Sequence, residues 1–208
     1  MFGRIFSLLI GYVFGCFLTA ELVAARFAGK SSDELGGSGN PGMAHIMSSL
    51  GFVPGMLTLL GDLLKAIAAA LLSLLLFHRA GYIVMLYAGL GCTLGHDFPF
   101  WRGYRGGKGV ATTSMAIVLY AFWPGLMANI VGMLVVFVTQ YLCIGGPCIP
   151  LAFTVFMLLR GNFEAALIAA VLTALSYYRH GSQIRGIREG TTEKTDVPGA
   201  IRKHLSNN

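Results

Sequence analysis

The sequence predicts an all-α polytopic integral membrane protein with about seven transmembrane helices. Hydrophobic residues make up 55% of its 208 residues and charged residues only 12%, whereas a soluble domain carries about a quarter charged residues. The mean hydropathy is +0.70, and apolar runs long enough to cross a bilayer recur along the chain. Most of the chain therefore cannot face water, and we expect a single membrane domain over residues 1–191.

The expected spans are the apolar runs between polar or helix-breaking segments. The first run, Ile5–Phe27, is too long for the core of a signal peptide, so we interpret it as a retained span. The others are Phe52–Phe77, Tyr82–Leu94, residues 110–122, Leu126–Leu142, Cys148–Leu159 and Phe163–Tyr178. Pro and Gly end helices, so breaks are expected at Trp123-Pro124-Gly125 and Gly145-Gly146-Pro147. Because two of the runs are short, five spans with re-entrant segments are an alternative.

The basic residues predict which loops face the cytoplasm. With seven spans and the N-terminus outside, eleven basic residues lie inside and three outside. The inner ones are Arg26, Lys30, Arg102, Arg105, Lys108, Arg179, Arg185, Arg188, Lys194, Arg202 and Lys203, and the outer ones are Arg4, Arg79 and Arg160. The two polar loops, residues 29–51 and 96–109, are then cytoplasmic, as is a polar, flexible C-terminal tail over residues 192–208. This placement explains the net charge of +6 without a nucleic-acid partner.

The first polar loop contains the run Gly36-Gly37-Ser38-Gly39-Asn40-Pro41-Gly42. Closely spaced glycines permit positive φ and expose backbone N–H groups, as an anion-binding loop requires. Ser38 and Asn40 add side-chain donors. An ordinary flexible loop explains the run equally well, so this segment alone leaves both interpretations open.

The second polar loop ends in Arg105-Gly106-Gly107-Lys108-Gly109. Glycines beside a lysine let the backbone approach a phosphate closely, and the helix that starts near Val110 directs its positive end to the same place. The spacing is not that of a Walker A loop, because Gly109 follows Lys108. A membrane anchor of basic and aromatic residues would explain the charges but not the glycines, so we favour phosphate binding.

Ionisable residues also occur inside or directly after the apolar runs. Asp62 and Lys65 are three residues apart and share one face of the second span, where we expect a structural or supporting role. We assign no role to Glu21. The pair Arg179-His180 is typical of a basic anchor to anionic lipid, although His180 also suits an anion. The four cysteines show no paired spacing, so we expect neither a disulfide nor a metal site.

Three blocks follow in order along nearly the whole chain. They are Gly37-Ser38-Gly39-Asn40-Pro41-Gly42, His96-Asp97-Phe98-Pro99 through Arg105-Gly106-Gly107-Lys108-Gly109-Val110-Ala111-Thr112, and Arg179-His180 through Gly190-Thr191. Together with the run Leu57–Lys65, these blocks resemble the acyl-phosphate:glycerol-3-phosphate acyltransferase family of bacterial inner membranes (the PlsY family).

The resemblance implies transfer of a fatty acyl group from acyl phosphate to the sn-1 hydroxyl of glycerol 3-phosphate. The products are lysophosphatidic acid and phosphate, in the first step of phospholipid synthesis. It also implies a multi-pass protein of the bacterial inner membrane whose site faces the cytoplasm. The substrates and membrane lipids are the expected partners, with no cofactor, no metal and no obligatory protein partner.

The resemblance further implies roles for residues of the three blocks. The predicted catalytic residues are Ser38, His96 and Lys108. The predicted substrate-binding residues are Gly37, Gly39, Asn40, Gly42, His45, Arg105, Gly106, Gly107, Gly109, His180 and Gln183. We expect Lys108 and Arg105 to face phosphate charge, the glycines to donate backbone N–H groups, and Ser38 and His96 to bond near the reacting carbonyl or hydroxyl. Whether His96 or a substrate phosphate oxygen acts as the base is left open.

Several positions depart from the family pattern. His45 and Ser48 stand where the family usually has Asn and Arg, and Gly181 and Gln183 where it has Arg and Asn. Arg105 replaces a lysine, which keeps the charge but changes the donor geometry. A lost guanidinium is expected to weaken binding of a phosphate substrate unless another cation compensates.

Two other functions fit parts of the sequence. A small transporter or channel for an organic phosphate or other anion would use glycine-rich breaks and a basic mouth, but the chain shows no internal repeat. A weakly active paralogue of the acyltransferase would explain the altered positions. Acyltransferases that use His-x-x-x-x-Asp are excluded, because none of the five histidines has Asp five residues later.

The predicted topology can be tested with single cysteines in a cysteine-free background. Cysteines at Ser38 and Tyr104 should resist a membrane-impermeant reagent added to sealed cells, because both positions lie in predicted cytoplasmic loops. A cysteine at Arg79, predicted outside, should react and is the positive control. Labelling at Ser38 or Tyr104 would overturn the topology.

Overall fold

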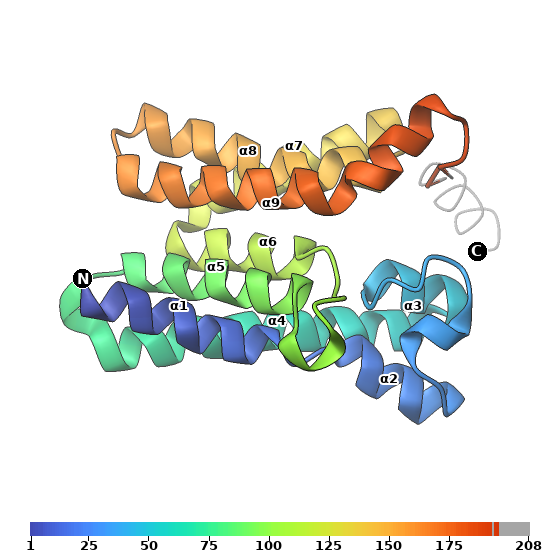
Figure 1. Cartoon of the computed structure of the whole chain (residues 1–208). Coiled ribbons are helices and arrows are strands. Elements are labelled where there is room, and N and C mark those ends of the chain that lie inside the picture. The colour runs from blue at the N-terminus through green and yellow to red at the C-terminus, as the bar shows by residue number, and fades with distance from the viewer. Residues whose placement is uncertain (193, 196–208) are drawn as a thin grey trace, which may run out of the picture. The chain divides into compact units, whose positions relative to one another are not determined.

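The computed structural model describes residues 1–192 and 194–195, and every regular element within them is a helix (Figure 1). The helices are α1 (Phe2–Gly15), α2 (Thr19–Ala28), α3 (Met43–Leu50), α4 (Phe52–Phe77), α5 (Ile83–Asp97), α6 (Val110–Tyr120), α7 (Phe122–Thr139), α8 (Leu142–Leu159) and α9 (Phe163–Arg188), with 3-10 turns η1 (Ser32–Leu35), η2 (His78–Ala80) and η3 (Phe100–Arg102). The chain divides into two compact units, Met1–Phe122 and Trp123–Asn208, and each is described by itself.

The all-α fold is thus confirmed. Four helical segments are long and apolar enough to cross a membrane, namely Phe2–Ala28, Phe52–Ala80, Phe122–Thr139 and Leu142–Leu159. α5 and α6 are shorter, and α9 joins an apolar first half to a basic last turn. The count of seven spans, their sidedness and the single membrane domain over residues 1–191 stay predictions. Apart from residues 192, 194 and 195, the predicted tail 192–208 lies outside the described residues.

Both predicted proline-glycine breaks are wrong in position. α6 ends at Tyr120, and Pro124 lies in the first turn of α7, where its missing N–H removes no helical hydrogen bond. α7 ends at Thr139 before Gln140, whose φ is 61°. The run Gly145-Gly146-Pro147 lies inside α8. Gly145 there serves close packing, because a Cβ at this position would lie 2.6 Å from the carbonyl oxygen of Gly132 in α7.

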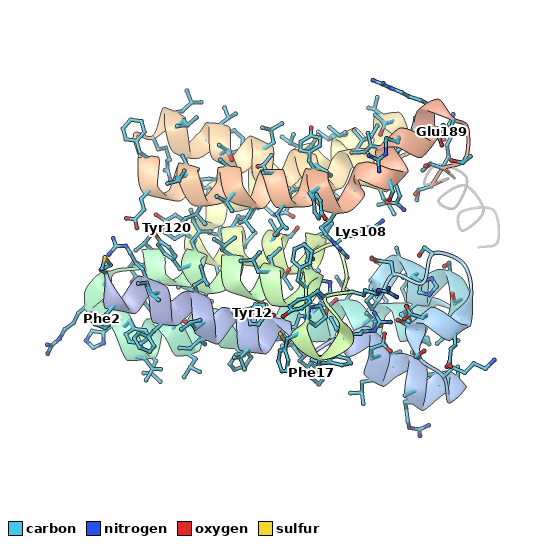
Figure 2. All side chains as sticks on the ribbon, in the orientation of Figure 1. Phe2, Tyr12, Phe17, Lys108, Tyr120 and Glu189 are labelled. Atoms are coloured by element: carbon cyan, nitrogen blue, oxygen red, sulfur yellow. The ribbon has the colours of Figure 1, made fainter. Side chains whose placement is uncertain are left out.

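The first span contains a break that the sequence pattern did not show. α1 ends at Gly15 and α2 begins at Thr19, with Phe17 in the gap (Figure 2). A break leaves backbone carbonyl groups without helical partners. The Trp101 indole donates to the Cys16 carbonyl at 2.7 Å, and Lys65 Nζ donates to the Phe17 carbonyl at 2.8 Å. Side chains from two other segments therefore stabilise the interruption.

α1 packs against α5 with their backbones in direct contact. Gly11 and Gly15 in α1 face Gly91 and Gly95 in α5, and each pair has the four-residue spacing that lets membrane helices approach closely. A Cβ at any of the four would lie 2.0–2.1 Å from a carbonyl oxygen of the other helix. The four residues with those carbonyls are Ala88, Cys92, Leu8 and Tyr12. Because a backbone cannot yield as a flexible side chain does, this contact sets the register of α1 against α5.

In the second unit, α8 packs along α9 (Figure 1). α9 does not end at Tyr178, as the apolar run predicted, but continues to Arg188. The hydrophobic pattern stops there because polar and basic residues, among them Arg185 and Arg188, follow. Helix formation does not stop, because the following residues include no proline and helical hydrogen bonds continue.

The glycine contact predicts a position-specific loss of stability. Gly91→Ala should destabilise the fold by at least about 1–3 kcal/mol, the usual cost of overpacking, because its Cβ would meet the Leu8 carbonyl oxygen at 2.0 Å. Gly181→Ala, also in a helix but with no atom within 4 Å of the added Cβ, is the matched control. Thermal unfolding in detergent measures both, and equal midpoints would contradict the assignment.

Candidate functional site

The two polar loops predicted to share one face are joined by Arg102. Its Nη2 lies 2.6 Å from the Asp33 carboxylate and 3.1 Å from that of Glu21, and donates to Ser32 Oγ at 3.2 Å. Its Nη1 donates to the Arg105 carbonyl at 2.8 Å. A planar guanidinium can hold several acceptors at once, so one side chain from η3 ties α2 and the first loop to the second loop. We use the name loop site for residues 29–42 and 98–109 together with the helix ends beneath them.

Glu21 is a residue of this site that sequence reasoning missed. It lies in α2 and accepts hydrogen bonds from the backbone N–H of Ser32, at 3.2 Å, and from the Ser32 hydroxyl. It also faces Arg102. The available signal was its charge, because a carboxylate inside an apolar segment usually has a specific partner.

The first glycine-rich loop has the backbone that its composition predicts. Gly37 and Gly39 adopt φ of 60° and 59°, a left-handed conformation that other residues rarely adopt. Ser38 is exposed at the tip, and its Oγ accepts from the Asn40 N–H at 3.4 Å. Gly42 follows as the N-cap of α3. The tip therefore presents a hydroxyl and an amide to the surroundings, and a substrate-binding role for these residues stays a prediction.

His45 anchors this loop from below. It is buried in α3, and its Nε2 lies 2.9 Å from the Ser32 carbonyl oxygen. A carbonyl only accepts, so Nε2 carries a proton and donates it. The other side of the ring faces Gly37, whose added Cβ would lie 3.7 Å from His45 Nδ1. Ser48, one turn further, is exposed and donates to the His45 carbonyl.

The second glycine-rich loop folds back on the end of α5. Gly106 N–H donates to the Asp97 carbonyl at 3.1 Å, and Gly107 N–H donates to the His96 carbonyl at 2.9 Å. A Cβ at Gly107 would lie 2.0 Å from His96 Nε2. In this structure the two N–H groups therefore bond to the end of α5, and the substrate-binding role of Gly106 and Gly107 stays a prediction. Their glycines are needed because backbone and imidazole approach each other closely.

The N-terminal end of α6 faces a carboxylate of the chain itself. Asp97 is fully buried, and a Cβ at the N-cap residue Gly109 would lie 2.9 Å from Asp97 Oδ1. A negative charge is stabilised at this end of a helix. The start of α6 at Val110 is as predicted. The positive end of this helix stabilises the Asp97 carboxylate, so it is not directed only at a substrate.

His96 lies in a buried polar cluster under the second loop. Its Nδ1 is 2.8 Å from Lys65 Nζ and 3.8 Å from Asp62 Oδ1. Lys65 and Asp62 form an ion pair of 2.8 Å, which confirms that they share one face of α4. All three side chains are more than nine-tenths buried. The ion pair, for which a structural role was expected, therefore contacts His96, a predicted catalytic residue.

The two predicted phosphate-facing cations lie on the rim of the loop site. Lys108 is half-buried and lies two residues before the start of α6 (Figure 2), whereas Arg105 is exposed. Behind them, Thr93 Oγ1 bonds Thr112 and Thr113 at 3.0 and 3.1 Å, which holds α5 to the first turn of α6. The rim cations therefore stand on a rigid base, whereas their own contact with phosphate stays a prediction.

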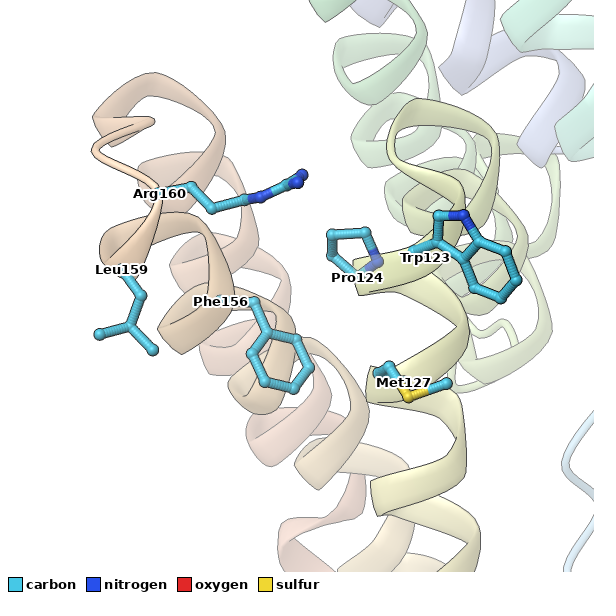
Figure 3. Close-up of a pocket in the computed structure, with 6 residues that line it drawn as sticks. All are labelled: Trp123, Pro124, Met127, Phe156, Leu159 and Arg160. Carbon is cyan, nitrogen blue, oxygen red and sulfur yellow. The ribbon is translucent and has the colours of Figure 1, made fainter.

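The remaining predicted residues belong to the second unit. His180 is buried in α9, and its Nδ1 donates to the Ser176 carbonyl at 2.8 Å. The Gln183 carbonyl accepts from Thr192 Oγ1 at 2.7 Å. A hollow of this unit between α7 and α8 is lined by Trp123, Pro124, Met127, Phe156, Leu159 and Arg160 (Figure 3). None of the predicted site residues lines this hollow.

Comparisons with known proteins agree over nearly the full length. The profile of the glycerol-3-phosphate acyltransferase family matches residues 5–190. The chain is 37% identical to glycerol-3-phosphate acyltransferase 1 of Lactobacillus acidophilus, over 98% of this chain and 97% of that protein. Its identity to the glycerol-3-phosphate acyltransferase of Clostridioides difficile is 34%, over 93% and 96%. A crystal structure of PlsY, an integral membrane glycerol 3-phosphate acyltransferase, in its glycerol 3-phosphate form matches with a TM-score of 0.83 and 25% identity, over 95% of this chain and 98% of that one.

The Arg102 contacts predict that a single substitution loosens the first loop. Arg102→Gln should accelerate hydrogen exchange of the 31–42 backbone about tenfold, because hydrogen bonds to charged groups contribute about 1.5–3 kcal/mol and partial exposure lowers that value. Exchange followed by mass spectrometry measures this, with Arg105→Gln on the exposed rim as the control. Unchanged exchange in Arg102→Gln would show that the loop does not depend on this contact.

Proposed function

Because the chain belongs to the glycerol-3-phosphate acyltransferase family, we propose that it transfers a fatty acyl group from acyl phosphate to the sn-1 hydroxyl of glycerol 3-phosphate. The observation that carries this proposal is the family match over residues 5–190, which includes the first two blocks quoted from the sequence and all but the last residue of the third. The chain is thus a membrane acyltransferase, and the acyl donor and the position acylated are the proposed details.

The proposed reaction is attack of one oxygen on an activated carbonyl. The sn-1 hydroxyl oxygen of glycerol 3-phosphate forms a bond to the carbonyl carbon of acyl phosphate, and the bond from that carbon to the phosphate oxygen breaks. The hydroxyl proton leaves with the phosphate, so the products are lysophosphatidic acid and inorganic phosphate. Both substrates and both products carry phosphate, which suits a site whose rim holds the cations Lys108 and Arg105.

Positioning and charge neutralisation supply the catalysis in this proposal. An acyl phosphate is a mixed anhydride with a good leaving group, so correct orientation of the two substrates contributes up to about 7–11 kcal/mol. Lys108 and Arg105 neutralise phosphate charge, and the Ser38 hydroxyl at the loop tip donates to a carbonyl or phosphate oxygen. Preorganised donors of this kind act most strongly where charge develops in the transition state.

His96 is poorly placed to act as the base in this reaction. Its Nδ1 already receives a hydrogen bond from Lys65 Nζ, and a neutral imidazole then carries its proton on Nε2. Neither nitrogen is left to accept a proton from substrate. This geometry supports a phosphate oxygen of acyl phosphate as the proton acceptor, the second of the two possibilities that the sequence left open.

The proposed enzyme works from the cytoplasmic side of the bacterial inner membrane. The split of eleven basic residues against three supports this orientation, as does the gathering of the two polar loops around Arg102.

Ser48 and Gln183 stand where the family has Arg and Asn. We expect glycerol 3-phosphate to bind more weakly for that reason than it would to an arginine at position 48.

The direct test is turnover by the purified chain. Incubation with an acyl phosphate and glycerol 3-phosphate should release phosphate and form lysophosphatidic acid in equal amounts. Glycerol, which lacks the phosphate, and an acyl thioester, which lacks the anhydride, should each fail as substitutes. Product from the thioester alone would overturn the proposed donor.

Lys108→Ala should lower kcat/KM about 100- to 1,000-fold, the usual effect of removing one donor from a developing oxyanion. Membrane insertion should be unchanged, because Lys108 lies at the rim. Lys30→Ala removes an equally charged but exposed lysine of the first loop and is the control. If Lys108→Ala keeps phosphate release near the normal rate, the second loop is not the active site.

A further inference from the structure

Lys65 is an unusual residue for the middle of an apolar helix. It lies in the membrane-spanning segment Phe52–Ala80 and is 6% exposed. Burying an ammonium costs several kcal/mol even when it is paired, and an apolar residue of similar volume often gives a more stable fold. Stability alone therefore does not explain a lysine at this position, so its individual contacts are informative.

Four acceptor atoms in the described part of the chain surround the Lys65 ammonium. Asp62 Oδ1, the Phe17 carbonyl oxygen and His96 Nδ1 each lie 2.8 Å from Nζ, and the Gly15 carbonyl oxygen lies at 3.4 Å. An ammonium has three hydrogens and no lone pair. The three short contacts use all three hydrogens, and one of them goes to the imidazole.

This contact determines which nitrogen of His96 carries its proton. Because Nζ donates to Nδ1, the neutral ring must hold its hydrogen on Nε2. Nε2 is the atom that packs against Gly107. The carbonyl of the same residue accepts from Gly107 N–H at 2.9 Å. His96 therefore contacts the turn directly before Lys108 through both its backbone and its ring.

We propose that Lys65 is a positioning residue for the acyl transfer, acting through His96. Its ammonium holds the imidazole in the Nε2–H form and in one orientation, and the imidazole in turn packs against Gly107 so that Lys108 meets the substrate phosphate. Asp62 pairs with the ammonium at 2.8 Å and accepts a hydrogen bond from Thr19 Oγ1 at 3.3 Å. The proposal rests on the acyltransferase function proposed above, although the state of His96 can be measured without turnover.

The experiment separates this role from a purely structural one. Lys65→Met alone leaves Asp62 as an unpaired buried charge and is expected to fold poorly. The double variant Asp62→Asn/Lys65→Met is neutral and similar in volume, so it should still fold, with a thermal midpoint lowered by the loss of the donor to the Phe17 carbonyl, and turnover is compared per folded molecule. A structural role predicts normal turnover in the double variant. A positioning role predicts turnover lowered about 100-fold, the effect of a small misplacement of reacting groups.

Nitrogen-15 NMR of histidine-labelled full-length protein reports the tautomer directly, and His96→Gln identifies the His96 signals. We expect Nε2–H in the wild type, and a mixture of tautomers or Nδ1–H in the double variant. Nδ1–H in the wild type, an unchanged tautomer in the double variant, or a changed tautomer with normal turnover would each overturn the proposal. If the wild type shows Nε2–H but no turnover with acyl phosphate and glycerol 3-phosphate, the proposed function fails, and so does the link from Lys65 to acyl transfer.

Discussion

The backbone contact between α1 and α5 is the constraint on which the first unit depends. Four glycines leave no Cβ at the points of closest approach, so carbonyl groups of one helix lie against the chain of the other. In a membrane, where apolar side chains gain little by leaving lipid, such close packing is a main source of helix association. The contact places Gly15, the last residue of α1, against Cys92, one turn before His96. The gap between α1 and α2 is thereby brought beside the end of α5.

The gap then determines where polar side chains are needed. Backbone carbonyls that lose their helical partners inside a membrane cost several kcal/mol each unless they are satisfied within the protein. Lys65 and Trp101 donate to carbonyls of the gap, and the Tyr12 hydroxyl donates to the Phe98 carbonyl at 2.9 Å on the loop side. These donors come from α4, η3 and α1. The interruption of the first span therefore draws α4 and η3 to one place under the loop site.

The loop site consists of a buried framework and a rim. His45, His96, Asp97 and Arg102 are engaged by other parts of the chain, so they hold the loops instead of offering open donors. Ser38 and Arg105 are exposed and Lys108 is half-buried. This division clarifies the altered positions of the chain. His45, at a position where the family resemblance predicts Asn, belongs to the framework, because its Nε2 donates to the Ser32 carbonyl. Ser48 is exposed, so its departure from arginine concerns what the rim can bind.

The sequence by itself determined the helical class, the two polar loops and the family, and it predicted which residues bind phosphate. Composition and glycine content act locally, and the blocks are contiguous in the chain. It did not show the break after Gly15, because the residues on both sides are equally apolar. It also did not show that Gly145 packs inside a helix. Only the tertiary structure decided where the N–H groups of Gly106 and Gly107 point and which nitrogen of His96 lies against Lys65. These features depend on partners far away in the sequence, as Lys65 is from Phe17, 48 residues apart, and Arg102 is from Ser32, 70 residues apart. A hydrogen bond is specified by geometry at about 3 Å, and that geometry exists only once the helices have packed.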